Sequence, residues 1–311
     1  MSKLRIQVHN WQGKANDLIT ALKRQGASIV STSPDILLID FDNSPYYVKK
    51  LEAAYQQGAE IALYSHGAPV ITAYDRVWVP DPRVRVYLAQ SQGQKEVMEA
   101  YGYPHPIEVI GWHYCKVKKF KPVSEIKNIL FAPWHPHSNG YMQQAQLQAN
   151  TDVYNKLRQM PYQLTVMHIG DLRYNGLRED RNVTYIKSKM INQHSVEEID
   201  KADVVVANYV GTFGALAVAR GKPTVLYGQN VRPHDGYCDA DVTYVKNWDK
   251  YRDLLFYPHD ISELKPVATQ NMIEYAARHE AKEWREKFIG DPLDEEKLYK
   301  TLQDLLEVSD D

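Results

Sequence analysis

Apolar and polar positions follow each other along the chain in a pattern that predicts strands and helices in regular succession. Short apolar runs of strand length alternate with longer amphipathic stretches, the arrangement of a parallel sheet with crossover helices. Gly26 and Gly58 close the first two helical stretches, as helix-ending glycines do. In this first part the predicted strands are 4–8, 36–40, 61–64, 77–79, 84–89 and 107–110, and the predicted helices are 13–25, 44–57 and 93–101.

The same alternation begins again after a lysine-rich segment, 111–126, which is predicted to be a linker. The strands predicted there are 129–132, 164–168, 183–186, 203–207, 224–227 and 242–245, and the helices are 141–160, 195–201 and 213–220. Two amphipathic helices follow, the first with an apolar stripe made of Ile273, Ala276, Ala277, Ala281, Trp284 and Phe288.

This pattern predicts an α/β protein with two Rossmann-like domains that face a central cleft. We expect an amino-terminal domain over 1–118, a second domain over 119–268, and carboxy-terminal helices in 269–311 that dock across both. A chain of 311 residues is long enough for two cores.

Composition narrows the class of protein. An apolar fraction of 44% with 24% charged residues is typical of a globular protein. Two cysteines, Cys115 and Cys238, are too few for a disulfide framework. There is no signal-like start and no apolar run of membrane-spanning length, so we expect a cytoplasmic protein without a transmembrane segment. A formal charge of −2 indicates no overall basic surface for nucleic acid.

The segment 201–228 reads as strand, small-residue turn, helix and strand. Gly211 lets a ligand approach the backbone closely, and the Thr212 hydroxyl can donate a hydrogen bond. Unpaired N–H groups and the positive end of the helix dipole would lie at that turn, so it could bind an anion such as a phosphate. An ordinary βαβ crossover with a tight turn remains the alternative.

Three segments carry a resemblance to a known family. They resemble the spine of nucleotide-sugar glycosyltransferases of the B-type fold, in particular the branch of CDP-glycerol glycerophosphotransferases, capsular polysaccharide transferases and UDP-N-acetylglucosamine 2-epimerases. The resemblance implies that the donor nucleotide binds the second domain and the acceptor enters from the first. The segments are AQSQGQKEVMEAYGYPHPIEVIGW, KNILFAPW and ADVVVANYVGTFGALAVARGKPTVLYG.

The resemblance also implies roles for individual residues. His66, in the turn Ser65-His66-Gly67, is similar to a histidine proposed as base in the glycerophosphotransferase branch, and imidazole suits that task. His135 and His137 follow a strand and could donate to the diphosphate or leaving group, or could merely cap the next helix.

Further donor contacts come from three loops. Gly211 and Thr212 would form the diphosphate site. Lys187 and Lys189, after a predicted strand, lie where this fold usually holds the base, although a solvated charged loop is equally consistent with them. The related transferases also have a donor-binding loop that corresponds to Arg232, His234 and Asp235.

We therefore expect a glycosyltransferase that moves a sugar from a UDP-, GDP-, CDP- or dTDP-linked donor to a hydroxyl of a glycan, a lipid-linked sugar or a modified DNA base. No metal or other cofactor is expected to be required, since B-type enzymes generally manage the leaving diphosphate with dipoles and basic groups. Two alternatives remain: transfer of a polyol phosphate, and a nucleotide-sugar binding protein without turnover. The stretch 214–217 permits the second alternative, because it lacks the glutamate that holds the ribose in many B-type transferases.

Overall fold

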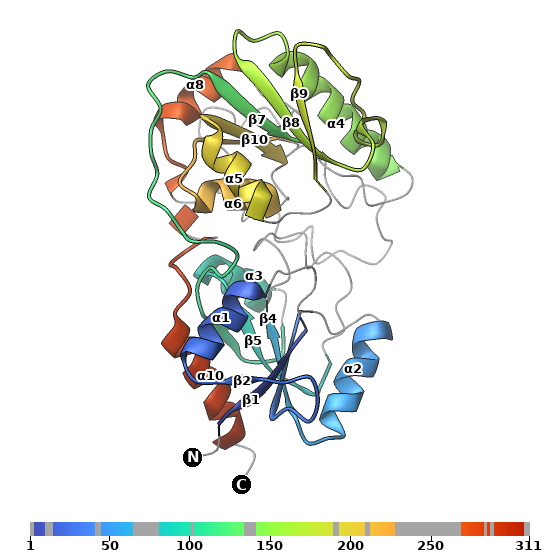
Figure 1. Ribbon diagram of the computed structural model, residues 1–311, viewed down its shortest axis with the longest axis vertical. Coiled ribbons are helices and arrows are strands. Elements are labelled where there is room, and N and C mark those ends of the chain that lie inside the picture. The colour runs from blue at the N-terminus through green and yellow to red at the C-terminus, as the bar shows by residue number, and fades with distance from the viewer. Residues whose placement is uncertain are drawn as a thin grey trace. The chain divides into compact units, whose positions relative to one another are not determined.

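The computed structural model describes residues 3–9, 15–40, 45–64, 81–100, 103–133, 141–188, 193–208, 212–227, 269–282, 285–286 and 289–307. The chain divides into two compact units (Figure 1). Among the described residues, the first unit comprises 3–64, 81–116 and 286–307, and the second comprises 117–285. The chain thus passes from the first unit to the second after Lys116 and returns after Arg285.

The first unit contains a parallel sheet of six strands in the order β2-β1-β3-β4-β5-β6. The strands are β1 (Arg5–Val8), β2 (Ser28–Ile29), β3 (Ile36–Ile39), β4 (Glu60–Tyr64), β5 (Val84–Ala89) and β6 (Ile107–Val109). Its helices are α1 (Asn16–Arg24), α2 (Pro45–Tyr55), α3 (Gln92–Ala100) and α10 (Glu295–Glu307).

The core of the first unit forms where α1 and α10 cover one face of this sheet. Buried side chains such as Leu18 and Leu22 of α1 and Leu298 of α10 pack against Ile6 and Leu38 of the central strands. Figure 1 shows α2 on the other side of the sheet. Burial of the strands on both faces explains why they read as continuous apolar runs in the sequence.

The second unit contains a parallel sheet of five strands in the order β11-β10-β7-β8-β9. The strands are β7 (Asn128–Ala132), β8 (Gln163–Ile169), β9 (Thr184–Ser188), β10 (Val204–Asn208) and β11 (Thr224–Tyr227). The helices are α4 (Tyr141–Leu157), the 3-10 turn η3 (Leu172–Asn175), α5 (Gln193–Lys201), α6 (Thr212–Ala219) and α8 (Gln270–Arg278). Apolar side chains of α4 and α8 form one core with the strands.

One helix prediction was wrong. The apolar stripe predicted a single helix from 273 to 288, but α8 ends at Arg278, and His279 has an extended backbone with φ −122° and ψ 127°. The ring of His279 stacks on Tyr275 at a centroid distance of 4.0 Å, and its Nδ1 lies 2.9 Å from the Tyr275 carbonyl oxygen. The His279 N–H still donates to the Tyr275 carbonyl oxygen at 3.0 Å, and the extended backbone of His279 ends the helix there.

Candidate functional site

Both sheets have a topological switch point, where the chain reverses the direction in which it adds strands. In the second sheet, β8 and β9 are added on one side of β7, whereas β10 and β11 are added on the other. In the first sheet, β2 lies on one side of β1 and β3 on the other. Open parallel sheets bind ligands outside the carboxyl ends of the strands at this point. The relevant edges are therefore those at β7 and β10, and at β1 and β3.

At the edge of the second sheet, β10 leads into helix α6. The helix begins at Thr212, which is half-buried, and residues from Phe213 to Ala219 are buried. Because α6 is anchored on all sides, its N-terminus keeps a fixed direction beside the end of β10. The first turn contains no acidic residue, as expected from the sequence 214–217. No carboxylate from the first turn of α6 neutralises the positive end of the helix dipole, and this favours an anionic ligand.

Lys187 lies inside a strand rather than after it. It is the fourth residue of β9, is exposed, and pairs in register with His168 of β8. His168 is buried, with 7% of its surface exposed. Burial lowers the pKa of His168, an effect that the neighbouring Lys187 reinforces and that a hydrogen bond to Gly170 and the charge of Asp171 partly offset. The pair thus combines a cation with an imidazole that favours the neutral form.

A polar network lies at the carboxyl ends of strands β8 and β11. The Tyr227 hydroxyl donates to Asn150 Oδ1 of α4 at 2.7 Å, and Asn150 Nδ2 donates to the Asn175 carbonyl oxygen at 2.9 Å. Asn175 Nδ2 in turn donates to the carbonyl oxygens of Ile169 and Asp171, each at 2.9 Å. The first two of these hydrogen bonds are buried and the two from Asn175 are partly buried, and a buried polar network of this kind favours one geometry. The network fixes the turn after β8 relative to α4 and β11.

At the switch point of the first sheet, the residues directly after β1 and β3 form a pair. His9 Nδ1 and Asp40 Oδ1 are 2.9 Å apart, and the side chains are 11% and 0% exposed. Tyr64, the last residue of β4, donates its hydroxyl to the His9 carbonyl oxygen at 2.8 Å. Sequence reasoning missed this pair, because the order of strands in a sheet, and hence the adjacency of positions 9 and 40, cannot be read from apolar periodicity. The available signal was a polar residue directly after each of two buried strands.

Most of the residues singled out in the sequence lie outside the described residues. Those are His66, Gly211, His135, His137, Lys189, Arg232, His234 and Asp235. Along the chain, the loop with His135 and His137 follows β7, and Gly211 precedes Thr212 after β10. His66 follows β4 by two residues. Thr212 and Lys187 are the two predicted site residues whose position the structure describes.

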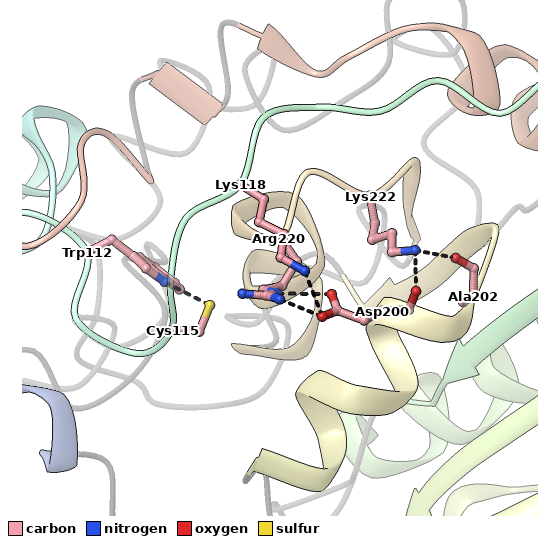
Figure 2. Close-up of polar contacts among 7 residues, drawn as sticks. All are labelled: Trp112, Cys115, Lys118, Asp200, Ala202, Arg220 and Lys222. Carbon is pink, nitrogen blue, oxygen red and sulfur yellow. Dashed lines mark hydrogen bonds and ion pairs between the residues drawn. The ribbon is translucent and has the colours of Figure 1, made fainter.

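A second charged cluster lies at the opposite, amino-terminal edge of the second sheet (Figure 2). The Asp200 carboxylate accepts hydrogen bonds from Lys118 Nζ at 2.9 Å and Arg220 Nε at 3.0 Å. Burial alone raises the pKa of Asp200, but these hydrogen bonds outweigh it and hold the pKa below its ordinary value. Lys222 Nζ donates to the carbonyl oxygens of Asp200 and Ala202, at 2.6 and 2.7 Å. The cluster attaches the linker to α5 and α6, away from the ligand-binding edge.

The described part of the chain has neither a candidate metal site nor a helix that could span a membrane. It contains no group of three or more histidine, cysteine or carboxylate side chains placed to hold a metal ion. Among its helices, none combines the length and the apolar character that crossing a bilayer requires.

Comparison with known proteins gives a fold. No protein-family model and no curated protein sequence matches the chain. The glycosyltransferase SnogD from Streptomyces nogalater matches with a TM-score of 0.52 and 12% identity, over 99% of this chain and 100% of SnogD. A variant of the wall teichoic acid polymerase TagF matches with a TM-score of 0.51 and 12% identity, over 98% of this chain and 90% of TagF.

The spinosyn forosaminyltransferase SpnP matches with a TM-score of 0.50 and 10% identity, over the full length of both chains. At such identities the likeness establishes the fold alone. The structure agrees with this fold: it has two parallel, Rossmann-like α/β sheets, and the carboxy-terminal helix α10 packs against α1. The predicted fold is therefore confirmed: the chain has the B-type glycosyltransferase fold (GT-B).

Proposed function

We propose that this protein is a glycosyltransferase that moves a sugar from a nucleotide-activated donor to a hydroxyl acceptor. One observation carries the proposal: helix α6 begins at the switch point of the second sheet, with its N-terminus beside the ends of β10 and β7. Backbone N–H groups and the helix dipole at such a position stabilise a diphosphate, both in the bound donor and as it leaves. The likeness in fold to SnogD and SpnP, which are glycosyltransferases, supports this reading.

In this proposal the second unit binds the donor. Gly211 and Thr212 hold the diphosphate, and His135, His137 and Arg232 stabilise its charge. Lys187 and Lys189 contact the nucleoside, and His234 and Asp235 contact the sugar. We propose no role for a metal ion, because N–H groups and basic side chains suffice to stabilise the leaving diphosphate.

In the first unit, a base takes the proton of the acceptor hydroxyl. The sequence resemblance gives this role to His66, two residues beyond β4. A histidine base contributes about 10²- to 10⁴-fold to the rate of such a transfer.

The test is a thermal-shift screen with UDP-, GDP-, CDP- and dTDP-linked sugars, followed by analysis of the nucleotide released. A bound donor raises the melting temperature in proportion to its saturation. Release of a nucleoside diphosphate indicates glycosyl transfer, whereas release of a nucleoside monophosphate indicates polyol-phosphate transfer. Stabilisation without release of either identifies a binding protein without turnover, and no stabilisation by any donor refutes the proposal.

Thr212→Ala makes the screen specific to the proposed diphosphate site. A hydrogen bond to a charged group contributes about 1.5–3 kcal/mol, so the variant should bind the donor about 10- to 100-fold more weakly. Thr301→Ala is the matched control, since it removes the same hydroxyl from helix α10 of the first unit. Equal donor affinity in the two variants would exclude Thr212 from the site.

A further inference from the structure

Gln90 lies at the carboxyl end of strand β5, and ligands of open parallel sheets bind outside this edge. It follows Ala89, the last residue of β5, and comes two residues after Leu88, which pairs in register with Tyr64 at the end of β4. The candidate base His66 stands at the same separation beyond Tyr64 in the sequence. Gln90 therefore belongs to the strand end next to the one that leads into His66.

Two glutamines near the end of β5 are equally buried but differ in their hydrogen bonds. Gln90 is 0% exposed, and Gln94, in the first turn of helix α3, is 1% exposed. Gln94 Oε1 accepts the Gln90 backbone N–H at 2.6 Å, and Gln94 Nε2 donates to the Tyr87 hydroxyl at 3.3 Å. In the described part of the chain, neither Nε2 nor Oε1 of Gln90 meets a hydrogen-bond partner. One glutamine thus completes the fold, and the other carries an amide whose donors and acceptor are unused.

The backbone of Gln90 is held on both sides. Its N–H is bonded to Gln94, whose own N–H donates to Ser91 Oγ at 3.2 Å and so caps helix α3. Gly290 packs against the same segment: a Cβ there would lie 3.5 Å from Ser91 Cβ and 3.7 Å from the Gln90 carbonyl oxygen. The Gln90 side chain therefore extends from a fixed backbone, which suits a residue that positions a ligand.

Stability does not explain the Gln90 side chain. An amide that is buried without partners loses its hydrogen bonds to water and gains none in return. Such groups are rare in folded proteins, and each calls for a reason. The preceding residues Leu88 and Ala89, both 0% exposed, show that this strand end accommodates apolar side chains. The unused amide of Gln90 is therefore a candidate for contact with a ligand.

The chemistry of the amide limits the kind of ligand. Nε2 only donates hydrogen bonds, and Oε1 only accepts them. A phosphate or carboxylate could bond Nε2 alone, and an ammonium group could bond Oε1 alone. A hydroxyl both donates and accepts, so two neighbouring hydroxyls can bond both ends of the amide. Because Gln90 is fully buried, the group that reaches it must also be small, which favours a hydroxyl over the edge of a nucleobase.

We propose that Gln90 binds two neighbouring hydroxyl groups of the acceptor, and so selects a neutral sugar or polyol as the acceptor. Nε2 donates to one hydroxyl oxygen, and Oε1 accepts from the other hydroxyl. The inference rests on the proposed glycosyltransferase function and names the acceptor class of that reaction. Gln90 takes no part in the transfer itself, so its loss weakens acceptor binding and leaves donor binding intact.

The first experiment compares the melting temperatures of the wild-type protein, Gln90→Met and Gln94→Met in the full chain without ligand. Methionine has a similar length and no amide. Gln90→Met should melt about 2–6 °C higher, because an unpartnered buried amide is removed. Gln94→Met, the matched control, should melt lower by about the same amount, because the Gln90 N–H loses its acceptor. A lower melting temperature of Gln90→Met would mean that an internal water satisfies the amide, and would overturn the inference.

The second experiment measures sugar binding in the absence of any nucleotide, by saturation-transfer difference NMR. The probes are ribitol and the methyl glycosides of glucose, galactose and mannose, each of which carries neighbouring hydroxyls. We expect at least one probe to bind the wild-type protein and to bind Gln90→Met about 10- to 100-fold more weakly, since two hydrogen bonds are lost. Binding of no probe, or equal affinity in the two proteins, would overturn the inference.

Turnover separates this inference from the proposed function. With UDP-, GDP-, CDP- and dTDP-glucose as donors and the bound probe as acceptor, Gln90→Met should raise the acceptor KM about 10- to 100-fold at unchanged donor affinity. Equal acceptor KM in the two proteins would overturn the inference and leave the proposed function intact. A wild-type protein that binds the probe through Gln90 but releases nucleotide from no donor would refute the proposed function and support the hydroxyl site.

Discussion

The attachment of the linker to the second unit depends on one glycine, and replacing it gives a quantitative prediction. Gly221 ends helix α6 with φ +70°, and the N–H groups of Gly221 and Lys222 close the last turn on Val218 and Ala217. A Cβ at this position would lie 2.1 Å from the Lys119 carbonyl oxygen. A Cβ essentially never lies closer than 3.0 Å to such an atom, so the linker would have to move away by at least 3.0 − 2.1 = 0.9 Å.

The expected cost of Gly221→Ala has two parts. The left-handed backbone costs an alanine about 1 kcal/mol. Displacement of the linker also strains two backbone hydrogen bonds, from the Lys118 N–H to Ala219 and from the Lys121 N–H to Gly221, each contributing about 1 kcal/mol. The sum is about 3 kcal/mol. Gly170 is the matched control: its φ is +75°, but a Cβ there would have nothing within 4 Å, so Gly170→Ala should cost about 1 kcal/mol.

Differential scanning calorimetry measures both variants and can resolve separate transitions of the two units. At about 2–4 °C per kcal/mol for a unit of this size, Gly221→Ala should lower the melting temperature of the second unit by about 6–12 °C. Gly170→Ala should lower it by about 2–4 °C. Equal shifts in the two variants would refute the reasoning, because they would mean that the linker does not pack against Gly221.

Three further predictions concern the second unit. Asn150→Ala should destabilise it by about 2–4 kcal/mol in urea titrations, because Tyr227 and the Asn175 carbonyl each lose a buried hydrogen bond, and Tyr227→Phe by about 1–2 kcal/mol. Asp200→Asn should cost about 1–2 kcal/mol by the same measurement, whereas Glu125→Gln, in an exposed ion pair with Lys127, should change stability by less than about 0.5 kcal/mol. Burial lowers the pKa of His168, so the unfolded chain binds its proton at a higher pH than the folded one, and stability contributed by the neutral form is lost as the pH falls below about 6.5. Between pH 7 and 5, thermal unfolding should show a smaller loss of stability in His168→Leu than in the wild-type protein. An identical pH dependence in the two proteins would contradict a lowered pKa for His168.

The sequence contains most of the information needed for the fold. Continuous apolar runs, which alternate with helices ended by Gly26 and Gly58 and recur after residue 126, predicted the parallel α/β organisation because such strands are buried on both faces. Element boundaries were less accurate where tertiary contacts decide them. The two-residue strand β2 is too short to show a period, and β9 extends to Ser188 because it pairs with β8, which brings Lys187 into the strand.

The candidate site was predictable only in part. A turn before a helix is a local feature, so Thr212 could be found from the sequence. The pair of His9 and Asp40 joins positions 31 residues apart, and it exists because β3 pairs with β1 while β2 takes its other side. Local patterns do not encode that strand order. The polar network through Asn150 and Asn175 could not be predicted either, because it also joins residues far apart in the sequence.

Donor binding and release by the second unit are tested by a ³¹P NMR spectrum of the protein incubated with UDP-, GDP-, CDP- and dTDP-glucose in the presence of glycerol. We expect that, for at least one donor, the two diphosphate resonances of the nucleotide sugar disappear and those of the free nucleoside diphosphate replace them. Spectra that remain those of the intact donors, in every case, would contradict the claim that the second unit binds and releases a nucleoside diphosphate.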